Sequence, residues 1–229
     1  MAKRRLKPGW MLLGAVVGLL GLWVGLPRVL RGLDFFRVRR VEIAGLHYLD
    51  PTKVLGALQL STKASVFDHL RPLGRRVVAL RGVTSATVGR KLPGTLVVSI
   101  HEVEPVALIP GERGLVPIDA RARVLPFDPV ASAPDLPVVA GADRVLAGAL
   151  ARVRDYEPEL YARVAQAWRV GPDVVLEVEG RRLWLGPQIS AEDLRALMAV
   201  ERSLARQGHG YRELDGRFTG QVIVRGRRA

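Results

Sequence analysis

Residues 83–107, VTSATVGRKLPGTLVVSIHEVEPVA, show the most regular pattern in this chain. Apolar side chains occupy every second position from 96 to 100, which is typical of a β-strand with one buried face. Pro93-Gly94 is a turn signal, and the stretch 83–88 before it is rich in β-branched and small residues. The run therefore predicts two strands joined by a turn.

The preceding residues add one strand and two helices. The segment 38–43, VRRVEI, is strand-like. Asp50 is a good N-cap and Pro51 suits the first helical position, so a helix is predicted to begin there. A second helix is predicted at about residues 66–75, where apolar residues recur at helical spacing. The order β-α-α-β-β over residues 36–104 predicts a sheet covered by helices on one face.

These residues resemble a known family. The ordered set V83-x-x-A86-x-V88-x-R90-x-x-P93-x-T95-L96-x-V98-x-x-x-E102-x-x-P105-V106-A107 resembles the POTRA domain of the bacterial division proteins FtsQ and DivIB. Gly45 after the first strand and S65-V66-F67-D68 before the second helix fit the same resemblance. The alternative is a POTRA domain from an envelope transport or assembly protein. Those domains usually occur in tandem, and one copy is visible in this sequence.

The N-terminal region reads as a membrane anchor. Residues 10–26, WMLLGAVVGLLGLWVGL, carry no charge and are long enough to cross a bilayer, with Trp10 and Trp23 near the two ends. We therefore expect a transmembrane helix within residues 10–30, after a basic tail at residues 1–9. A cleaved signal peptide and a buried core helix are the alternatives. Positive charge flanks the run on both sides, so charge alone does not orient the helix.

The net charge of +13 is concentrated near this apolar run. The first 40 residues hold nine lysines and arginines against one aspartate, Asp34, and so account for +8 of it. Cations beside an apolar span indicate contact with anionic lipid of the bilayer. Nucleic-acid binding would need a basic folded domain with interleaved aromatic residues, and aromatic residues make up only 6% of the chain.

Four glycines of the apolar run, Gly14, Gly18, Gly21 and Gly25, fall on one face of a helix. Such a bare stripe allows another helix to approach closely, so these four residues are candidates for helix packing in the membrane. The alternative is that they have no such role, since glycine is common in membrane helices.

The remainder of the chain, residues 105–225, predicts a mixed β-domain with flanking helices, followed by a polar tail at 226–229. Short strands surround a turn at 110–114, and a hairpin is centred on Gly180. Helices are predicted at 143–154 and at 190–206, the latter opened by a capping-box-like Ser190-Ala191-Glu192-Asp193. Two final strands lie near 211–215 and 220–225. The fold class is therefore α+β, with a transmembrane helix, a POTRA domain and a β-domain in that order.

The sequence predicts no catalysis. It has no cysteine, and its four histidines (His47, His69, His101 and His209) are scattered, without metal-ligand spacing. Glu102 and Glu104 share one face of a strand, where a solvated pair is the common situation. We therefore expect no catalytic residue, no cofactor, no metal and no small-molecule substrate.

The closing run Leu214-Asp215-Gly216-Arg217-Phe218-x-Gly220-Gln221-Val222-x-Val224 resembles the end of the FtsQ β-domain. Two positions depart from the family pattern. Gly216 stands where the family has an apolar or branched residue, which could loosen the strand. Ala122 replaces a glycine often found in the turn after Asp119, so the geometry of that turn is in doubt.

The resemblance implies a function. FtsQ-type proteins are single-pass scaffolds of the inner membrane at the division site, with a cytoplasmic N-terminus. They receive FtsB/FtsL-like coiled-coil partners at the C-terminal strand, and their POTRA domain meets other divisome proteins. An edge strand can bind a partner through its free backbone groups. Phe218 is either an anchor for such a partner or a core residue. The implied partner-binding set is Arg217, Phe218, Thr219, Gly220, Val222 and Val224.

Overall fold

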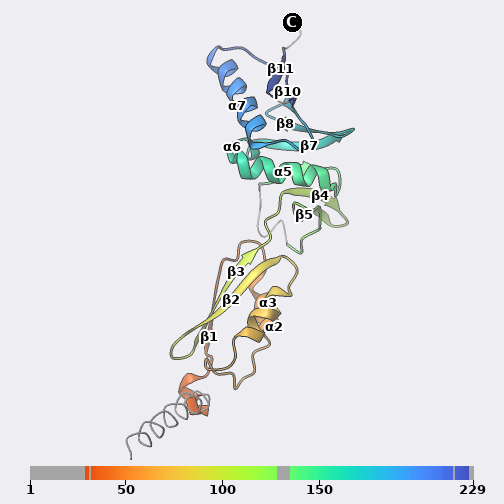
Figure 1. Ribbon diagram of the computed structural model, residues 1–229. Helices are drawn as coiled ribbons and strands as arrows, with labels where there is room; N and C mark the ends of the chain where they lie inside the picture. The colour runs from red at the N-terminus through yellow and green to blue at the C-terminus, as the bar shows by residue number, and fades with distance from the viewer. Residues whose placement is uncertain (1–28, 31, 128–134, 219, 227–229) are drawn as a thin grey trace, which may run out of the picture. The chain divides into compact units, whose positions relative to one another are not determined.

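The computed structural model describes residues 29, 30, 32–127, 135–218 and 220–226 (Figure 1). These residues form two compact units, one ending at Glu102 and the other beginning at Val103, with His47–Leu49 grouped with the second. The predicted span, residues 10–30, and the glycines Gly14, Gly18, Gly21 and Gly25 lie almost entirely outside the described residues. Within the described part of the chain, no helix combines the length and apolarity needed to cross a membrane.

The first unit is a three-stranded sheet with two helices on one face, and it confirms the predicted order β-α-α-β-β. The strand order is β1-β3-β2, with β1 parallel to β3 and β2 antiparallel to it. The elements are η1 (Asp34–Phe36), β1 (Arg40–Ala44), α2 (Pro51–Leu58), α3 (Arg71–Val78), β2 (Val83–Lys91) and β3 (Thr95–Glu102).

Local sequence signals explain the start of α2 but not the start of α3. Asp50 caps α2, since its carboxylate accepts a hydrogen bond from the Thr52 N–H at 2.8 Å. The predicted start of the second helix at residue 66 is wrong. The Asp68 carboxylate accepts the Ser65 N–H at 2.8 Å and closes a turn there, and the helix begins only at Arg71, with Pro72 in its first turn.

The alternation read from residues 96–100 is confirmed in β3. Leu96, Val98 and Ile100 are at most 3% exposed and pack under the helices. Gly45 follows β1 in a left-handed conformation (φ +81°), and a β-carbon there would collide with the carbonyl oxygen of Ile100. The turn after β1 therefore needs glycine for both its backbone angle and its close approach to β3.

The second unit is an eight-stranded mixed sheet in the order β11-β10-β9-β8-β7-β6-β4-β5. Its strands are β4 (Ala107–Gly111), β5 (Gly114–Ile118), β6 (Val138–Val139), β7 (Val164–Val170), β8 (Asp173–Val178), β9 (Arg181–Leu185), β10 (Glu213–Phe218) and β11 (Gln221–Arg225). Its helices are α5 (Arg144–Tyr156), α6 (Pro158–Tyr161) and α7 (Ala191–Arg206).

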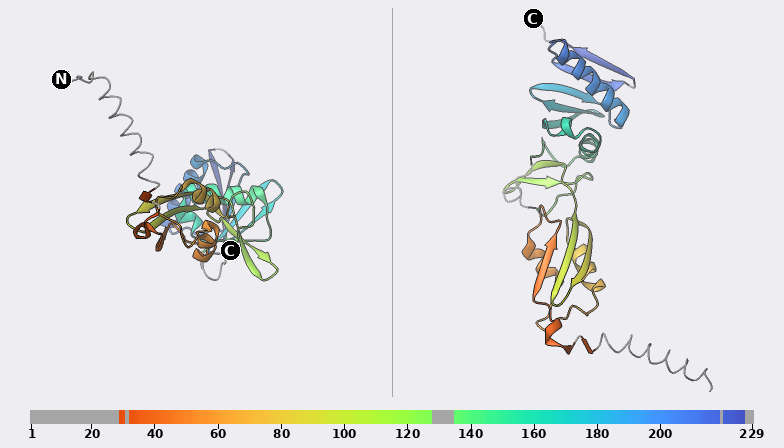
Figure 2. Two further views of the ribbon diagram at one scale, coloured as in Figure 1. Left: turned by 90° about the horizontal axis from the view of Figure 1, so that it is seen from below. Right: turned by 90° about the vertical axis from the view of Figure 1, so that its left-hand side faces the viewer.

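Helices α5 and α7 cover one face of this sheet (Figure 2). Each begins at a capping residue, Asp143 for α5 and Ser190 for α7, and the predicted capping box of Ser190 with Asp193 is present. Leu194 and Leu197 of α7 are fully buried in the hydrophobic core of this unit. Because α7 connects the parallel strands β9 and β10, its packing fixes the position of the final hairpin β10–β11.

Candidate functional site

Strand β11 is the last strand at one edge of the second sheet. One side of it pairs with β10, and among the described residues no strand pairs with the other side. Such an edge offers backbone N–H and C=O groups to an incoming strand. Ile223 and Val224 on this strand are 42% and 41% exposed, whereas Val222 is half-buried against the core. The edge therefore combines free backbone groups with exposed apolar side chains.

Phe218, at the end of β10, is 50% exposed. Phe218 is therefore not a core residue, and its role as an anchor for a partner stays a prediction. Gly220 in the following turn has φ +73°, a left-handed conformation that glycine adopts without strain. Phe218 pairs with Gln221 across this turn, so its ring stands beside the start of the edge strand.

A β-bulge separates this tip from the regular part of the β10–β11 ladder. Asp215 pairs with Ile223 and Phe218 pairs with Gln221, so Gly216 and Arg217 together oppose Val222. The ladder thus shifts its register at Gly216, and the predicted loosening of the strand there stays a prediction. Gly216 also serves the core, because a β-carbon there would lie 2.6 Å from Cδ1 of Leu197.

Arg217 is held by carboxylates from two strands. Its Nε and Nη2 donate to the two oxygens of Asp215 at 2.8 and 2.6 Å, and its Nη1 donates to Asp173 of β8 at 2.7 Å. Asp215 has no exposed surface, and its hydrogen bonds with Arg217 hold the pKa of this carboxyl below its ordinary value. Arg217 therefore connects β10 to β8 across β9, and it is not a freely solvated cation.

The same guanidinium lies against two aromatic rings. Arg217 Cζ is 4.9 Å from the ring centroid of Trp184 on β9 and 5.7 Å from that of Phe218. These distances are within cation–π range. The contact with Arg217 restricts the conformations of the Phe218 side chain, so this exposed ring is held in place.

A second ionic cluster ties α7 to the last hairpin. Glu201 of α7 is 7% exposed, accepts the Tyr211 O–H at 2.6 Å, and is paired with Arg163 through Nη2 at 2.9 Å. Burial alone would raise the pKa of Glu201, but the hydrogen bonds from Arg163 and Tyr211 outweigh it and lower the pKa. Burial, with the bond to Glu201, raises the pKa of Tyr211 to about 12. These groups keep the start of β10 against the helix.

The structure brings most of the predicted partner-binding residues together. Arg217 and Phe218 end β10, Gly220 is in the turn, and Val222 and Val224 lie on β11. Thr219 falls outside the described residues. Sequence reasoning missed the supporting groups, chiefly Asp173, Trp184 and Glu201. The one local signal was the Asp215-x-Arg217 spacing, because alternate residues of a strand share a face.

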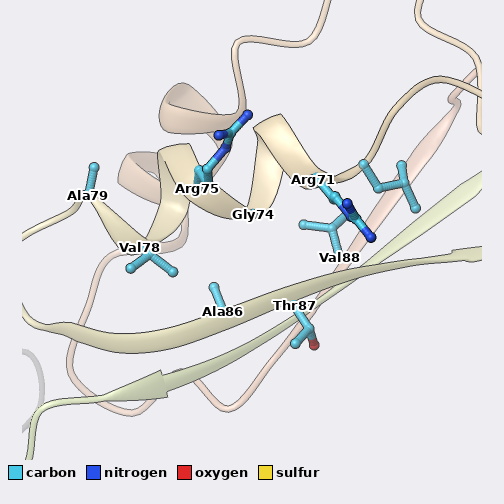
Figure 3. Close-up of a pocket in the computed structure, with 9 residues that line it drawn as sticks. Arg71, Gly74, Arg75, Val78, Ala79, Ala86, Thr87 and Val88 are labelled. Atoms are coloured by element: carbon cyan, nitrogen blue, oxygen red, sulfur yellow. The ribbon is translucent and has the colours of Figure 1, made fainter.

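A groove of about 880 Å³ lies between α3 and the edge strand β2 of the first unit (Figure 3). Arg71 and Arg75 of α3 lie on one side, and Ala86 and Val88 of β2 form part of the floor. Nothing in the structure identifies an occupant for this groove. Elsewhere among the described residues, no three histidine or acidic side chains come close enough together to hold a metal ion.

Comparison with known proteins identifies relatives. Residues 36–102 match the family model of the POTRA domain, FtsQ-type. The chain is 35% identical over 154 residues to "Cell division protein FtsQ" of Zymomonas mobilis, covering 62% of this chain and 46% of that protein. It is 30% identical over 120 residues to the protein of the same name from Geotalea daltonii, covering 51% and 42%. The matches thus span less than half the length of these curated relatives.

Among solved structures, the major extracytoplasmic domain of the trans isomer of the cell division protein DivIB from Geobacillus stearothermophilus is similar at a TM-score of 0.32 and 18% identity. That similarity covers 46% of this chain and 96% of the DivIB domain. The FtsQ-type POTRA match and the two FtsQ relatives confirm the predicted resemblance to FtsQ/DivIB proteins. Residues 36–102 of this chain thus match an FtsQ-type POTRA domain, and the chain is similar to curated cell division proteins named FtsQ.

Proposed function

We propose that this protein is a non-catalytic scaffold of the bacterial divisome. In this proposal a single transmembrane helix within residues 10–30 holds it in the cytoplasmic membrane at the division site, with the N-terminus cytoplasmic. Its extracytoplasmic β-domain recruits FtsB/FtsL-like coiled-coil proteins, while the POTRA domain meets other membrane proteins of the divisome. The FtsQ-type POTRA match and the similarity to two proteins named cell division protein FtsQ support the role in division.

The observation that carries the proposal is the exposed edge of β11 with Phe218 beside it. A partner strand that added to β11 would gain backbone hydrogen bonds and would cover Ile223 or Val224. Phe218 would supply the buried aromatic anchor that dominates many interfaces. Arg217 would act by bracing Phe218, since its own donors are engaged by Asp215 and Asp173.

Co-purification of the full chain from native membranes tests this proposal. Point variants test the site more specifically than removal of the C-terminus. A truncation after Asp215 would also delete Arg217, the ion-pair partner of Asp215, and Val222, which is half-buried against the core. We expect Phe218→Ala and Ile223→Lys each to reduce recovery of FtsB/FtsL-like proteins by about tenfold or more, the effect of losing an interface hot spot.

The matched control is Leu115→Lys, which changes a residue 39% exposed on β5, the edge strand at the opposite end of the same sheet. This variant should recover the partners in full. Loss of the partners with Leu115→Lys but not with Ile223→Lys would refute the assignment of the β11 edge. Recovery of secretion or outer-membrane components by the unaltered chain would instead support the envelope-transport alternative.

A further inference from the structure

One end of the first unit combines exposed apolar and cationic side chains from two separate elements. Phe35 of η1 is 60% exposed and Leu92 in the β2–β3 turn is 58% exposed. Of the large apolar residues that the structure describes, only Val29 is more exposed. The segment that follows η1 is bonded to this turn, because the N–H groups of Arg39 and Arg40 donate to the carbonyl of Gly94 at 2.8 and 3.3 Å.

Phe35 is held outward by its neighbours. The adjacent Phe36 ring packs edge-on against Phe67 at a centroid distance of 5.0 Å. The Phe36 carbonyl accepts the Val66 N–H at 3.0 Å and the Ser65 hydroxyl at 3.3 Å. Because residue 36 is fixed to the 65–67 segment, Phe35 cannot be buried without breaking these contacts. Its exposure is therefore a property of the fold.

Cations surround these two apolar groups. Arg37 and Arg39 follow η1, Arg40 begins β1 and Lys91 ends β2, and all four are exposed. Asp34 is paired with Arg37 at 2.7 Å, and Glu42 of β1 is paired with Lys91 at 3.2 Å. Arg39 and Arg40 remain as a positive surplus. Both elements lie at the same end of the unit in Figures 1 and 2.

We propose that this end of the first unit, the basal facet formed by Phe35, Leu92, Arg37, Arg39 and Arg40, rests on an anionic lipid surface. Apolar rings and leucines that enter the headgroup region, flanked by arginines, are the usual chemistry of interfacial membrane contact. The chain length supports this occupant. Phe35 follows the apolar run 10–26 by nine residues, which reach at most about 30 Å when fully extended.

The basal facet extends the lipid contact inferred from the charge near the apolar run, because it includes Leu92 of the folded unit. This residue is 66 positions beyond that run in the sequence, and the hydrogen bonds of Arg39 and Arg40 to Gly94 place its turn beside the segment that follows η1. Contact at Leu92 requires the folded unit to sit with its basal facet against the membrane. Lipid contact at Leu92 therefore distinguishes a unit that is oriented on the membrane from one that is only tethered to it.

The absence of cysteine allows single-site labelling of the full chain in lipid nanodiscs. An environment-sensitive fluorophore is attached at Phe35→Cys, at Leu92→Cys, or at the control Thr84→Cys. Thr84 is exposed on the same strand β2, about 26 Å from Leu92 by strand geometry. In discs containing phosphatidylglycerol, we expect a blue-shifted emission and protection from iodide at positions 35 and 92 but not at 84.

Removal of the charge, first from the lipid and then from the protein, completes the test. Discs of phosphatidylcholine alone should lose the protection at position 92. Arg39→Gln with Arg40→Gln should reduce the ratio of protected to exposed probe by about 25-fold, at about fivefold per arginine. The control, Arg206→Gln with Arg212→Gln in the second unit, removes the same charge and should have no effect.

Equal exposure of the probes at 92 and 84 in anionic discs would overturn the proposal. Equal protection at 92 in neutral and anionic discs would also overturn it, because the arginines would then not select the lipid. A variant that misfolds would alter the probe at Thr84 as well, so this readout identifies it. The experiment involves no divisome partner, and its outcome is independent of the proposed scaffold role.

Discussion

Replacement of Gly216 by alanine should destabilise the second unit through one defined contact. The added β-carbon would lie 2.6 Å from Cδ1 of Leu197, closer than carbon atoms can approach without displacement. Leu197 has no exposed surface and is packed between α7 and the sheet, so it has no free space to move into. Overpacking of this kind costs about 1–3 kcal/mol. The loss of glycine's freedom in the unfolded chain offsets about 0.4–1 kcal/mol.

We therefore expect the free energy of unfolding to fall by about 1–2 kcal/mol in Gly216→Ala. Leu197→Ala alone should cost about 2–5 kcal/mol, because it leaves a cavity in the core. In the double variant the alanine β-carbon enters that cavity, so the two losses should not add. A coupling of about 1 kcal/mol or more is expected for side chains in direct contact.

The assay is urea unfolding of the full chain in detergent, followed by tryptophan fluorescence. Trp168 and Trp184 report on the second unit, and replacing Trp10 and Trp23 by phenylalanine removes the other two emitters. Gly171→Ala is not a suitable control, since its φ of +61° adds backbone strain. Gly141→Ala is suitable, because a β-carbon there meets nothing within 4 Å. A neutral Gly216→Ala, or strictly additive losses in the double variant, would refute the packing argument.

Three further variants have expected outcomes, the first two in the same unfolding assay. Glu201→Gln should cost about 1–3 kcal/mol at neutral pH by leaving buried donors poorly satisfied. Since the folded pKa of Glu201 is lowered, its contribution is present above the ordinary value of 4.5 and is lost as pH falls below it, and Glu201→Gln should remove that pH dependence. Ala122→Gly should stabilise by about 0.5–1 kcal/mol, because Ala122 holds φ +59°; a destabilised variant would contradict this. Gly45→Ala should lower the free energy of unfolding of the first unit by more than about 2 kcal/mol, because its β-carbon would clash with Ile100. Amide hydrogen exchange of β3 measures this loss. Unchanged protection of β3 would contradict the clash.

The turn at Ala122 retains its left-handed geometry although alanine replaces the glycine expected there. The Asp119 carboxylate accepts hydrogen bonds from the N–H groups of Arg121 and Arg123, each at 2.9 Å. The backbone carbonyl of Asp119 accepts the Ala122 N–H at 2.8 Å. These hydrogen bonds of Asp119 fix the turn around Ala122 despite the conformational cost.

Some parts of the fold could be predicted because their signals are local. The alternation in β3 and the caps at Asp50 and Ser190 depend on residues within a few positions of one another. Strand β7 was missed, and its burial explains why. Its exposed and buried residues do not alternate strictly, and its ladder with β8 shifts between Val164 and Gln166. A period-two pattern is the only strand signal that a single sequence offers there.

The sequence alone determined the class of this protein: an apolar N-terminal run, an FtsQ-type POTRA domain and a β-domain with a characteristic final hairpin. The tertiary structure decided which groups of that hairpin are available. It placed β11 at a sheet edge, left Phe218 exposed and engaged Arg217 with Asp173, 44 residues away in sequence. Exposure and pairing depend on which distant segments pack together, and no local pattern of residues encodes that outcome.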